Sequence, residues 1–307
     1  GGRRVLLWSQ MHGDESTATM ALADIFSFFA EAPNHPVAQS ILKNLTLLVI
    51  PMLNPDGAER FQRRTAQLID MNRDALRLGT PEARILKTVH DRYRPDFGFN
   101  LHDQDTRSTV GQTKNVAAIS LLAPATDEAK TDNAIRLRAK LVAARLVEIL
   151  EQYIPQHLAK YDDTFEPRAF GDNIQKWGTS TVLIESGGWP NDPEKMFLRK
   201  MNFIGILSAL YAIATDEYAQ ADIAAYEKLP PNGKNFYDLI LRNIEFKSND
   251  ITPAITVDVG INFDEKADSV LDQLHLIGTV VDIGDLSTFG AFEEFDCTGT
   301  KLDTTMV

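Results

Sequence analysis

The sequence predicts an α/β fold with a mostly parallel or mixed central sheet and helices on both faces, followed by a small all-β module. Two observations predict the α/β part. Short apolar runs alternate with helical patterns along the chain, and these runs are apolar nearly throughout, as in strands buried on both faces. A third observation predicts the module, because β-like stretches without a long helix follow the breaker cluster Leu229-Pro-Pro-Asn-Gly233.

Apolar runs and helical periodicity define the expected elements in order. The five predicted strands of the sheet are Val5–Trp8, Leu45–Pro51, Phe97–Leu101, Val116–Leu122 and Thr181–Ile184. The helical patterns between most of them are Ser16–Ala30, Pro81–Tyr93, Asp127–Tyr153 and Pro193–Ala214. The β-like stretches of the module are Tyr237–Phe246, Ile251–Phe263 and Leu276–Val281. We therefore predict a domain over residues 1–229 and a small β-sandwich-like module over residues 230–307.

Composition narrows the classes of function. A net charge of −12 over 307 residues argues against nucleic acid and anionic membrane surfaces as partners. No apolar run approaches the roughly 20 residues of a membrane span, so we expect no membrane span in this chain. The single cysteine, Cys297, excludes an intramolecular disulfide and a zinc site built from several cysteines. Gly1-Gly-Arg-Arg4 leads directly into a predicted core strand, so we expect the N-terminus to be truncated.

Polar residues stand where the predicted strands end. His12 follows the first strand, with Glu15 three residues later; Asn54-Pro-Asp-Gly57 follows the second; His102 ends the third; and Glu185 ends another. Ligands of open α/β sheets bind outside the carboxyl ends of the strands. Taken singly, each group has an ordinary explanation: a surface pair, a tight turn, a core-edge histidine, a helix cap. Their shared position at one edge favours a functional site.

His12, Glu15 and His102 together make a ligand set of two histidines and one carboxylate, suited to one zinc ion. Three protein ligands leave a fourth position for water, which is the pattern of catalytic zinc. Zinc lowers the pKa of bound water to about 7 and polarises a carbonyl oxygen. Glu185 is placed to take the proton of that water and pass it to a leaving amine.

Basic residues lie between the proposed ligands, in Arg60-Phe-Gln-Arg-Arg64 and Asp70-Met-Asn-Arg-Asp74. In an acidic protein this placement indicates a subsite for a carboxylate, since arginine offers a planar, bidentate fork. For Arg60 we favour a solvated helix face. For Arg73, beside Asn72, we favour the functional role.

These motifs together resemble those of the zinc carboxypeptidases, the carboxypeptidase A-like metallopeptidases. The resemblance covers roughly residues 5 to 190, and the matching motifs, in the family order, are His12-x-x-Glu15, Asn54-Pro-Asp-Gly57, Arg63 through Asp70-x-Asn72-Arg73, His102 and Glu185. It implies the zinc carboxypeptidase-like fold and a zinc-dependent metallocarboxypeptidase that hydrolyses the C-terminal amide bond of a peptide. It also slightly favours a secreted or periplasmic location.

The resemblance implies a role for each matching residue at the metal. His12, Glu15 and His102 would bind one zinc ion. Glu185 would act first as general base and then as general acid. Asp70 would accept a hydrogen bond from the other ring nitrogen of His12 and orient that ring.

It also implies how the substrate is held. Asn72 and Arg73 would bind the terminal carboxylate. Arg63 would polarise the scissile carbonyl and stabilise the oxyanion; it lies nine residues before Asn72, as in the family pattern, and Arg64 is the alternative.

The sequence departs from the family pattern in two places. Thr65-Ala-Gln-Leu68 lacks the glycine of the corresponding step, and Tyr161, the one tyrosine near the expected mobile loop, has imperfect spacing and is left out of the predicted site. The specificity pocket would be lined from Arg168 to Trp177, where Arg168 and Lys176 allow a preference for an acidic side chain. The β module lies outside the resemblance.

Two other functions stay open. An N-acyl amino-acid deacylase of the aspartoacylase or succinylglutamate desuccinylase type would share the fold, the zinc ligands and an Asn-Arg pair, although the intact Asn54-Pro-Asp-Gly57 favours the peptidase. A catalytically silent peptide-binding module would use the same cleft for recognition alone. For either enzyme the partner is a peptide or an amino-acid conjugate with a free carboxylate.

Overall fold

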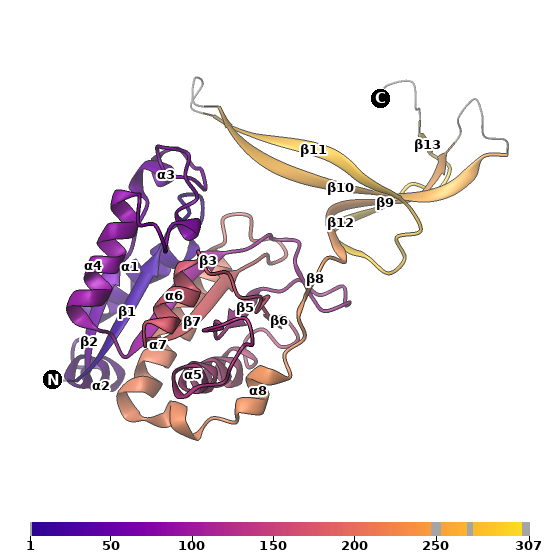
Figure 1. Ribbon diagram of the computed structural model, residues 1–307. Helices are drawn as coiled ribbons and strands as arrows, with labels where there is room; N and C mark the ends of the chain where they lie inside the picture. Colours follow the sequence, from indigo (N-terminus) through magenta and orange to yellow (C-terminus); the bar gives the residue numbers. More distant parts are fainter. Residues whose placement is uncertain (1, 247–252, 269–272, 303–307) are drawn as a thin grey trace.

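The computed structural model describes residues 2–246, 253–268 and 273–302 (Figure 1). The elements of its α/β part, in chain order, are β1 (Arg3–Ser9), α1 (Thr17–Glu31), α2 (Pro36–Asn44), β2 (Leu45–Ile50), α3 (Pro55–Glu59), the 3-10 helix η1 (Met71–Arg73), α4 (Pro81–Tyr93), β3 (Phe97–Asp103), β4 (Thr109–Val110), β5 (Ile119–Leu122), α5 (Ala134–Leu150), β6 (Leu158–Lys160), α6 (Phe170–Lys176), β7 (Ser180–Ser186), α7 (Met196–Thr215), the 3-10 helix η2 (Glu217–Gln220) and α8 (Ile223–Glu227). The later strands are β8 (Asn232–Gly233), β9 (Phe236–Phe246), β10 (Ile255–Asp268), β11 (Gln273–Gly284), β12 (Gly290–Asp296) and β13 (Lys301–Leu302).

The central sheet has six strands in the order β2-β1-β3-β7-β5-β6. Neighbouring strands are parallel except β5 and β7, which are antiparallel. The carboxyl ends of β1, β3 and β7 therefore meet at one edge of the sheet, where an α/β fold places its ligands. The predicted fold class is confirmed.

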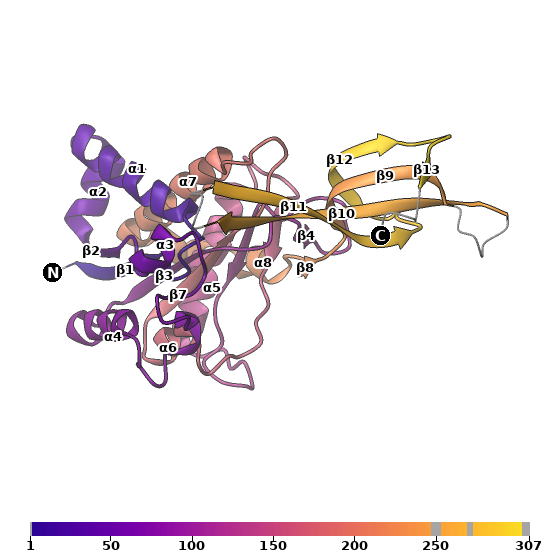
Figure 2. The same ribbon diagram turned by 90° about the horizontal axis from the view of Figure 1, so that it is seen from above.

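Helices cover both faces of this sheet (Figures 1 and 2). Alternate residues of β1 separate into two buried clusters, because successive side chains of a strand point to opposite faces. Val5 and Leu7 pack in a cluster with residues of α1, α2, α5 and α7, whereas Leu6 and Trp8 pack with residues of α4 and α6. The sheet is thus packed between two layers of helices, one on each face.

Among the described residues, one helix, α7, is long and apolar enough to cross a membrane by length and composition alone. Half of its most apolar stretch is buried inside the protein, against α1, α2 and α5. A helix buried in this way belongs to the core, so we assign no membrane span to it.

The structure differs from the expected elements mainly in short segments. The helices α2, α3 and α6 and the strand β6 were not predicted, because each is too short to show a clear periodicity. The helix predicted from Asp127 begins only at Ala134. Asn133 ends the preceding loop, since its side-chain oxygen accepts hydrogen bonds from the backbone N–H groups of Ile135 and Arg136, both at 3.0 Å.

The C-terminal strands form one all-β sheet in the order β11-β10-β9-β12, with β13 also paired to β9. In the described part of the chain this is a single sheet, not the two packed sheets expected of a β-sandwich. β10 and β11 make a long ribbon that extends back over the α/β part (Figures 1 and 2). Part of the predicted strand Ile251–Phe263, residues 251 and 252, lies outside the described residues.

Polar contacts join this sheet to the α/β part close to its carboxyl edge. Arg107, in the loop after β3, forms an ion pair with Asp238 of β9 at 3.1 Å. Asn232 of β8, which pairs with β4 and precedes the sheet in the chain, donates a hydrogen bond to Gln104 at 2.6 Å. The division of the chain near residue 230 stays a prediction.

Candidate active site

Strand ends and one turn bring four predicted residues together. His12 lies in the turn after β1, and Glu15 stands two residues before α1; a backbone hydrogen bond from the Glu15 N–H to the His12 carbonyl, 3.2 Å long, closes the turn. His102 of β3 and Glu185 of β7 are direct neighbours across the sheet. All four are buried, with exposures of 2% for His12, 8% for Glu15, 3% for His102 and 6% for Glu185.

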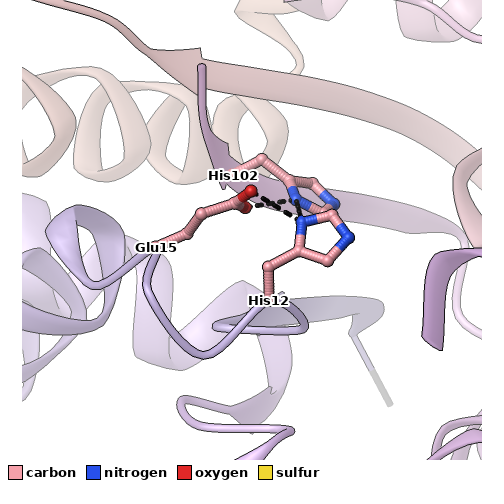
Figure 3. Close-up of side chains that lie close together, drawn as sticks. All are labelled: His12, Glu15 and His102. Atoms are coloured by element: carbon pink, nitrogen blue, oxygen red, sulfur yellow. Dashed lines mark hydrogen bonds and ion pairs between the residues drawn. The ribbon is translucent and has the colours of Figure 1, made fainter. Parts of the chain in front are cut away.

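The side chains of His12, Glu15 and His102 point at one another (Figure 3). Their potential ligand atoms all lie within 4.8 Å of one another. Each histidine presents Nδ1, and the two Nδ1 atoms are 3.2 Å apart. The Glu15 oxygens lie 2.6 Å from each of these nitrogens.

This donor set fits a zinc ion. Ligand atoms at about 2.0–2.2 Å from a tetrahedral zinc are roughly 3.3 Å from one another. The two Nδ1 atoms are 3.2 Å apart, whereas the Glu15 oxygens lie at hydrogen-bond distance, 2.6 Å, from them. Two imidazole nitrogens and a carboxylate that converge in a buried space place three electron-rich groups together, which a cation stabilises. His12, Glu15 and His102 are therefore the residues that would hold the metal.

Asp70 lies behind His12. Its Oδ1 is 3.3 Å from the Nε2 of His12, so Nδ1 of the ring faces the cluster while Nε2 faces the carboxylate. Asp70 is held in turn by the Arg63 guanidinium, at 3.1 Å from Nε and 3.0 Å from Nη2. Burial favours the neutral acid, but the hydrogen bond with His12 and the charge of Arg63 outweigh it and hold the pKa of Asp70 well below its usual range.

Arg63, and not Arg64, reaches the cluster. The Nη1 of Arg63 lies 3.0 Å from the Nδ1 of His12 and 3.4 Å from Glu15. The Arg64 side chain instead donates to the Leu68 carbonyl at 2.9 Å, and it does not line the cavity beside the cluster. Of the two candidates from the sequence, Arg63 has the geometry to contact a bound substrate.

The two buried carboxylates have opposite electrostatic surroundings. Burial opposes ionisation of Glu15, but the charge and hydrogen bond of His102, together with those of His12, hold its pKa well below the usual range. Burial raises the pKa of Glu185, and the charges of Glu15 and Asp103 add to that effect against the opposing charge of His102. A pair of acids with separated pKa values is typical of an active site in which one binds and the other exchanges protons.

A cavity of about 360 Å³ connects these groups with the predicted carboxylate subsite. Glu185, Asn72 and Arg73 all line it. The side-chain oxygen of Asn72 accepts a hydrogen bond from the Phe170 N–H at 2.9 Å, which leaves its NH₂ group for another acceptor. Arg73 is anchored through Nη1 to the Asn72 carbonyl at 2.8 Å and pairs with Glu166 at 3.4 Å.

Two residues that line the cavity are not among the site residues predicted from the sequence. Tyr161 lines the cavity, and the charge of Glu185, with burial, raises the pKa of its phenol; this residue was named from the sequence but left out of the predicted site because its spacing is imperfect. Asp172, in the first turn of α6, also lines the cavity; it lies within the segment from Arg168 to Trp177 that was expected to line the specificity pocket, but it was not singled out there. Arg168 and Lys176, which suggested an acidic preference, do not line the cavity.

The backbone at Leu68 and at Gly13 shows why glycine suits these two places in the chain. Leu68, where the family step has glycine, has a left-handed backbone with φ 61°. Gly13 does not need such a conformation; it is required because a Cβ there would lie 2.0 Å from the Gly57 carbonyl carbon. The Gly13 turn therefore packs directly on the Asn54-Pro-Asp-Gly57 turn, and Asn54 links the two by donating to the Met11 carbonyl at 3.3 Å.

Comparison with known proteins supports the motifs. The zinc carboxypeptidase family model matches residues 1–110. Carboxypeptidase 2 of Trichophyton rubrum is 29% identical over 153 residues, which cover 48% of this chain and 28% of that protein. Carboxypeptidase SOL1 of Arabidopsis thaliana is 35% identical over 65 residues, 21% of this chain and 13% of that protein. The resemblance to zinc carboxypeptidases is thereby confirmed, although the matched region spans less than a third of the length of these curated relatives.

Solved structures agree on the fold. A metallo-carboxypeptidase from Pseudomonas aeruginosa, in complex with (2-guanidinoethylmercapto)succinic acid, matches with a TM-score of 0.54 at 18% identity, over 71% of this chain and 58% of that chain. A metallo-carboxypeptidase from Burkholderia cenocepacia matches with a TM-score of 0.50 at 16% identity, over 72% and 57% of the two chains. At these identities the likeness is one of fold.

Proposed function

We propose that this protein is a zinc-dependent metallocarboxypeptidase that hydrolyses the C-terminal amide bond of a peptide. One observation carries the proposal: Nδ1 of His12, Nδ1 of His102 and the Glu15 carboxylate converge in one cavity with the buried Glu185. The match of residues 1–110 to the zinc carboxypeptidase family supports it.

Glu185 is the residue that moves protons. When bound by His12, Glu15 and His102, zinc would supply Lewis acidity, polarising a carbonyl and making water a better nucleophile. The Glu185 carboxylate accepts a proton from the attacking water as the new C–O bond forms. It then gives this proton to the amine nitrogen as the C–N bond breaks, so each turnover returns Glu185 to its starting state. Because burial raises the pKa of this carboxyl, it binds the proton more readily than an exposed glutamate would.

The arginines and Asn72 orient the substrate. Arg63 donates to the oxygen that becomes negatively charged in the transition state, and its tie to Asp70 keeps the guanidinium in place. Asn72 and Arg73 hold the terminal carboxylate through an NH₂ group and a guanidinium. These contacts select a substrate with a free carboxylate next to the scissile amide. The named ligand of the Pseudomonas aeruginosa structure, a succinic acid derivative, supports a carboxylate-bearing ligand.

The test measures zinc and turnover together. The purified protein is loaded with zinc, its bound metal is quantified, and amine release from N-acylated peptides is followed. We expect one zinc ion per chain, and we expect Glu185→Gln to lower kcat by about 10²–10⁴-fold while zinc content is kept. Glu82→Gln is the matched control, since Glu82 is 8% exposed and does not line the cavity. A protein without stoichiometric zinc, or a fully active Glu185→Gln variant, would contradict the proposal.

The same assay separates the other functions. N-acyl amino acids are tested beside the peptides. Faster hydrolysis of the acyl amino acids would point to a deacylase. Tight peptide binding without turnover by the zinc-loaded protein would point to a silent binding module.

A further inference from the structure

One wall of the cavity is formed by residues other than His12, Glu15 and His102. Asn100 of β3, Leu183 of β7 and Leu122 of β5 are direct neighbours across three strands. All three line the cavity, together with Pro124 and with Asp172 from α6. This wall is apolar except for two groups, the Asn100 amide and the Asp172 carboxyl.

Asp172 is buried, and it forms no ion pair within the part of the chain that the structure describes. The residue is only 9% exposed. Arg136 is the cation among the main influences on its pKa, and Arg136 is already bound to the Ala123 carbonyl at 3.2 Å and to Asp163 at 3.4 Å. Burial therefore raises the pKa of Asp172 to about 7, although backbone hydrogen bonds oppose the rise.

The other acid of this region is neutralised. Glu166 lines the cavity and pairs with Arg168 at 2.7 Å and with Arg73 at 3.4 Å. The Arg168 side chain is 56% exposed and held by this pair, so it offers no positive charge to the cavity. The electrostatic character of the wall thus comes from Asp172.

A second acceptor on the same wall lacks a donor. The Oδ1 atom of Asn100 is buried and has no hydrogen-bond partner within the described residues. Leaving a buried acceptor unsatisfied is unfavourable. The cavity is therefore lined by an acceptor that lacks a donor and by a carboxylate that lacks a cation. A ligand group with several N–H donors and a positive charge would satisfy both.

We propose that this wall binds the side chain of the C-terminal substrate residue and selects lysine or arginine, with Asp172 as the partner of the cation. Leu122, Leu183 and Pro124 would contact the aliphatic stem of such a side chain, while its charged end reaches Asp172 and Asn100. The inference rests on the proposed carboxypeptidase function. It reverses the acidic preference that Arg168 and Lys176 suggested in the sequence.

The experiment compares four N-acylated tripeptides that differ only in a C-terminal lysine, arginine, leucine or glutamate. With zinc-loaded protein at pH 8, we expect kcat/KM for lysine or arginine to exceed that for leucine by at least about tenfold. Asp172→Asn should lower kcat/KM for the two basic peptides about 10- to 100-fold, the worth of a hydrogen bond to a charged group, and leave leucine within about threefold. Asp56→Asn is the control for charge, because Asp56 is exposed on α3 and does not line the cavity.

A wild-type preference for leucine or glutamate would overturn the inference and leave the carboxypeptidase function standing. So would an unchanged lysine-to-leucine ratio in Asp172→Asn. If that variant does not fold, product inhibition of the wild-type protein gives the answer: free lysine and arginine should inhibit at lower concentrations than leucine, and the reverse order would refute the role of the wall. Failure to cleave any of the peptides would instead remove the proposed function itself.

Discussion

The contact between Gly13 and Gly57 gives a sharp prediction for Gly13→Ala. A Cβ on residue 13 would lie 2.0 Å from the Gly57 carbonyl carbon and 2.3 Å from the Ala58 nitrogen, where ordinary contacts begin at 3.4 Å. Both atoms belong to the backbone, so one of the two turns must move by roughly 1 Å or more. Overpacking of this kind costs about 1–3 kcal/mol of stability.

The displacement also reaches the metal ligands, because His12 and Glu15 flank residue 13. We expect Gly13→Ala to lower zinc affinity by about 10- to 100-fold, as loss of ligand orientation does in other metal sites. Urea unfolding measures the stability, and competition with a chromophoric chelator measures the affinity. Gly79→Ala is the control, since its Cβ would meet Asp74 at an ordinary 3.5 Å. Wild-type stability together with wild-type zinc affinity in Gly13→Ala would refute the packing argument.

Three further changes test neighbouring parts of the structure. Asp70→Asn weakens the orientation of His12, so chelator competition should give about 10- to 100-fold lower zinc affinity; an unchanged affinity would contradict this. The pKa of Asp172 is about 7 in the folded protein, above its unfolded value of 3.8, so the folded state binds more protons and loses stability as pH rises from about 4 to 7. Urea unfolding at pH 5 and pH 8 should therefore show that metal-free Asp172→Asn loses less stability over this interval than the metal-free wild-type protein, by up to about 3 kcal/mol; parallel profiles of the two proteins would exclude the effect. Leu68→Gly should raise the unfolding free energy by roughly 0.5–1 kcal/mol, because glycine relieves the left-handed strain at the cost of a more flexible unfolded chain; a destabilised variant would show that the exposed Leu68 side chain contributes packing.

Much of the fold could be predicted because the buried strands of the sheet are continuous apolar runs in the sequence. Once β1, β3 and β7 are recognised as parallel strands, their carboxyl ends must share an edge, and His12, His102 and Glu185 follow at those ends. The helices α2, α3 and α6 were not predicted, because segments of five to nine residues show too little hydrophobic periodicity. The β-sandwich expectation was wrong in the described residues for a related reason: strand patterns do not say whether strands join one sheet or two.

Spacing relative to the family pattern favoured Arg63 and kept Arg64 as the alternative, but it could not show where either side chain points. The chain between Glu59 and Asp70 is irregular, with left-handed residues at Phe61 and Leu68, so neighbouring side chains diverge. One reaches His12 and the other turns back to its own loop. These side-chain directions come from the folded backbone, because irregular segments have no repeat from which a direction can be extrapolated.

By itself the sequence determined the class of fold, the order of the polar residues along one sheet edge and the chemistry that their types allow. These are properties of local pattern: strand burial, strand ends and residue identity. The tertiary structure alone decided which atoms converge, and it placed Asp172 in the cavity while its neighbour in sequence, Arg168, stays outside. The physical reason is that a charge acts through distance and burial, and both are set by elements far apart in the chain, here α6, β3 and β7 around one cavity.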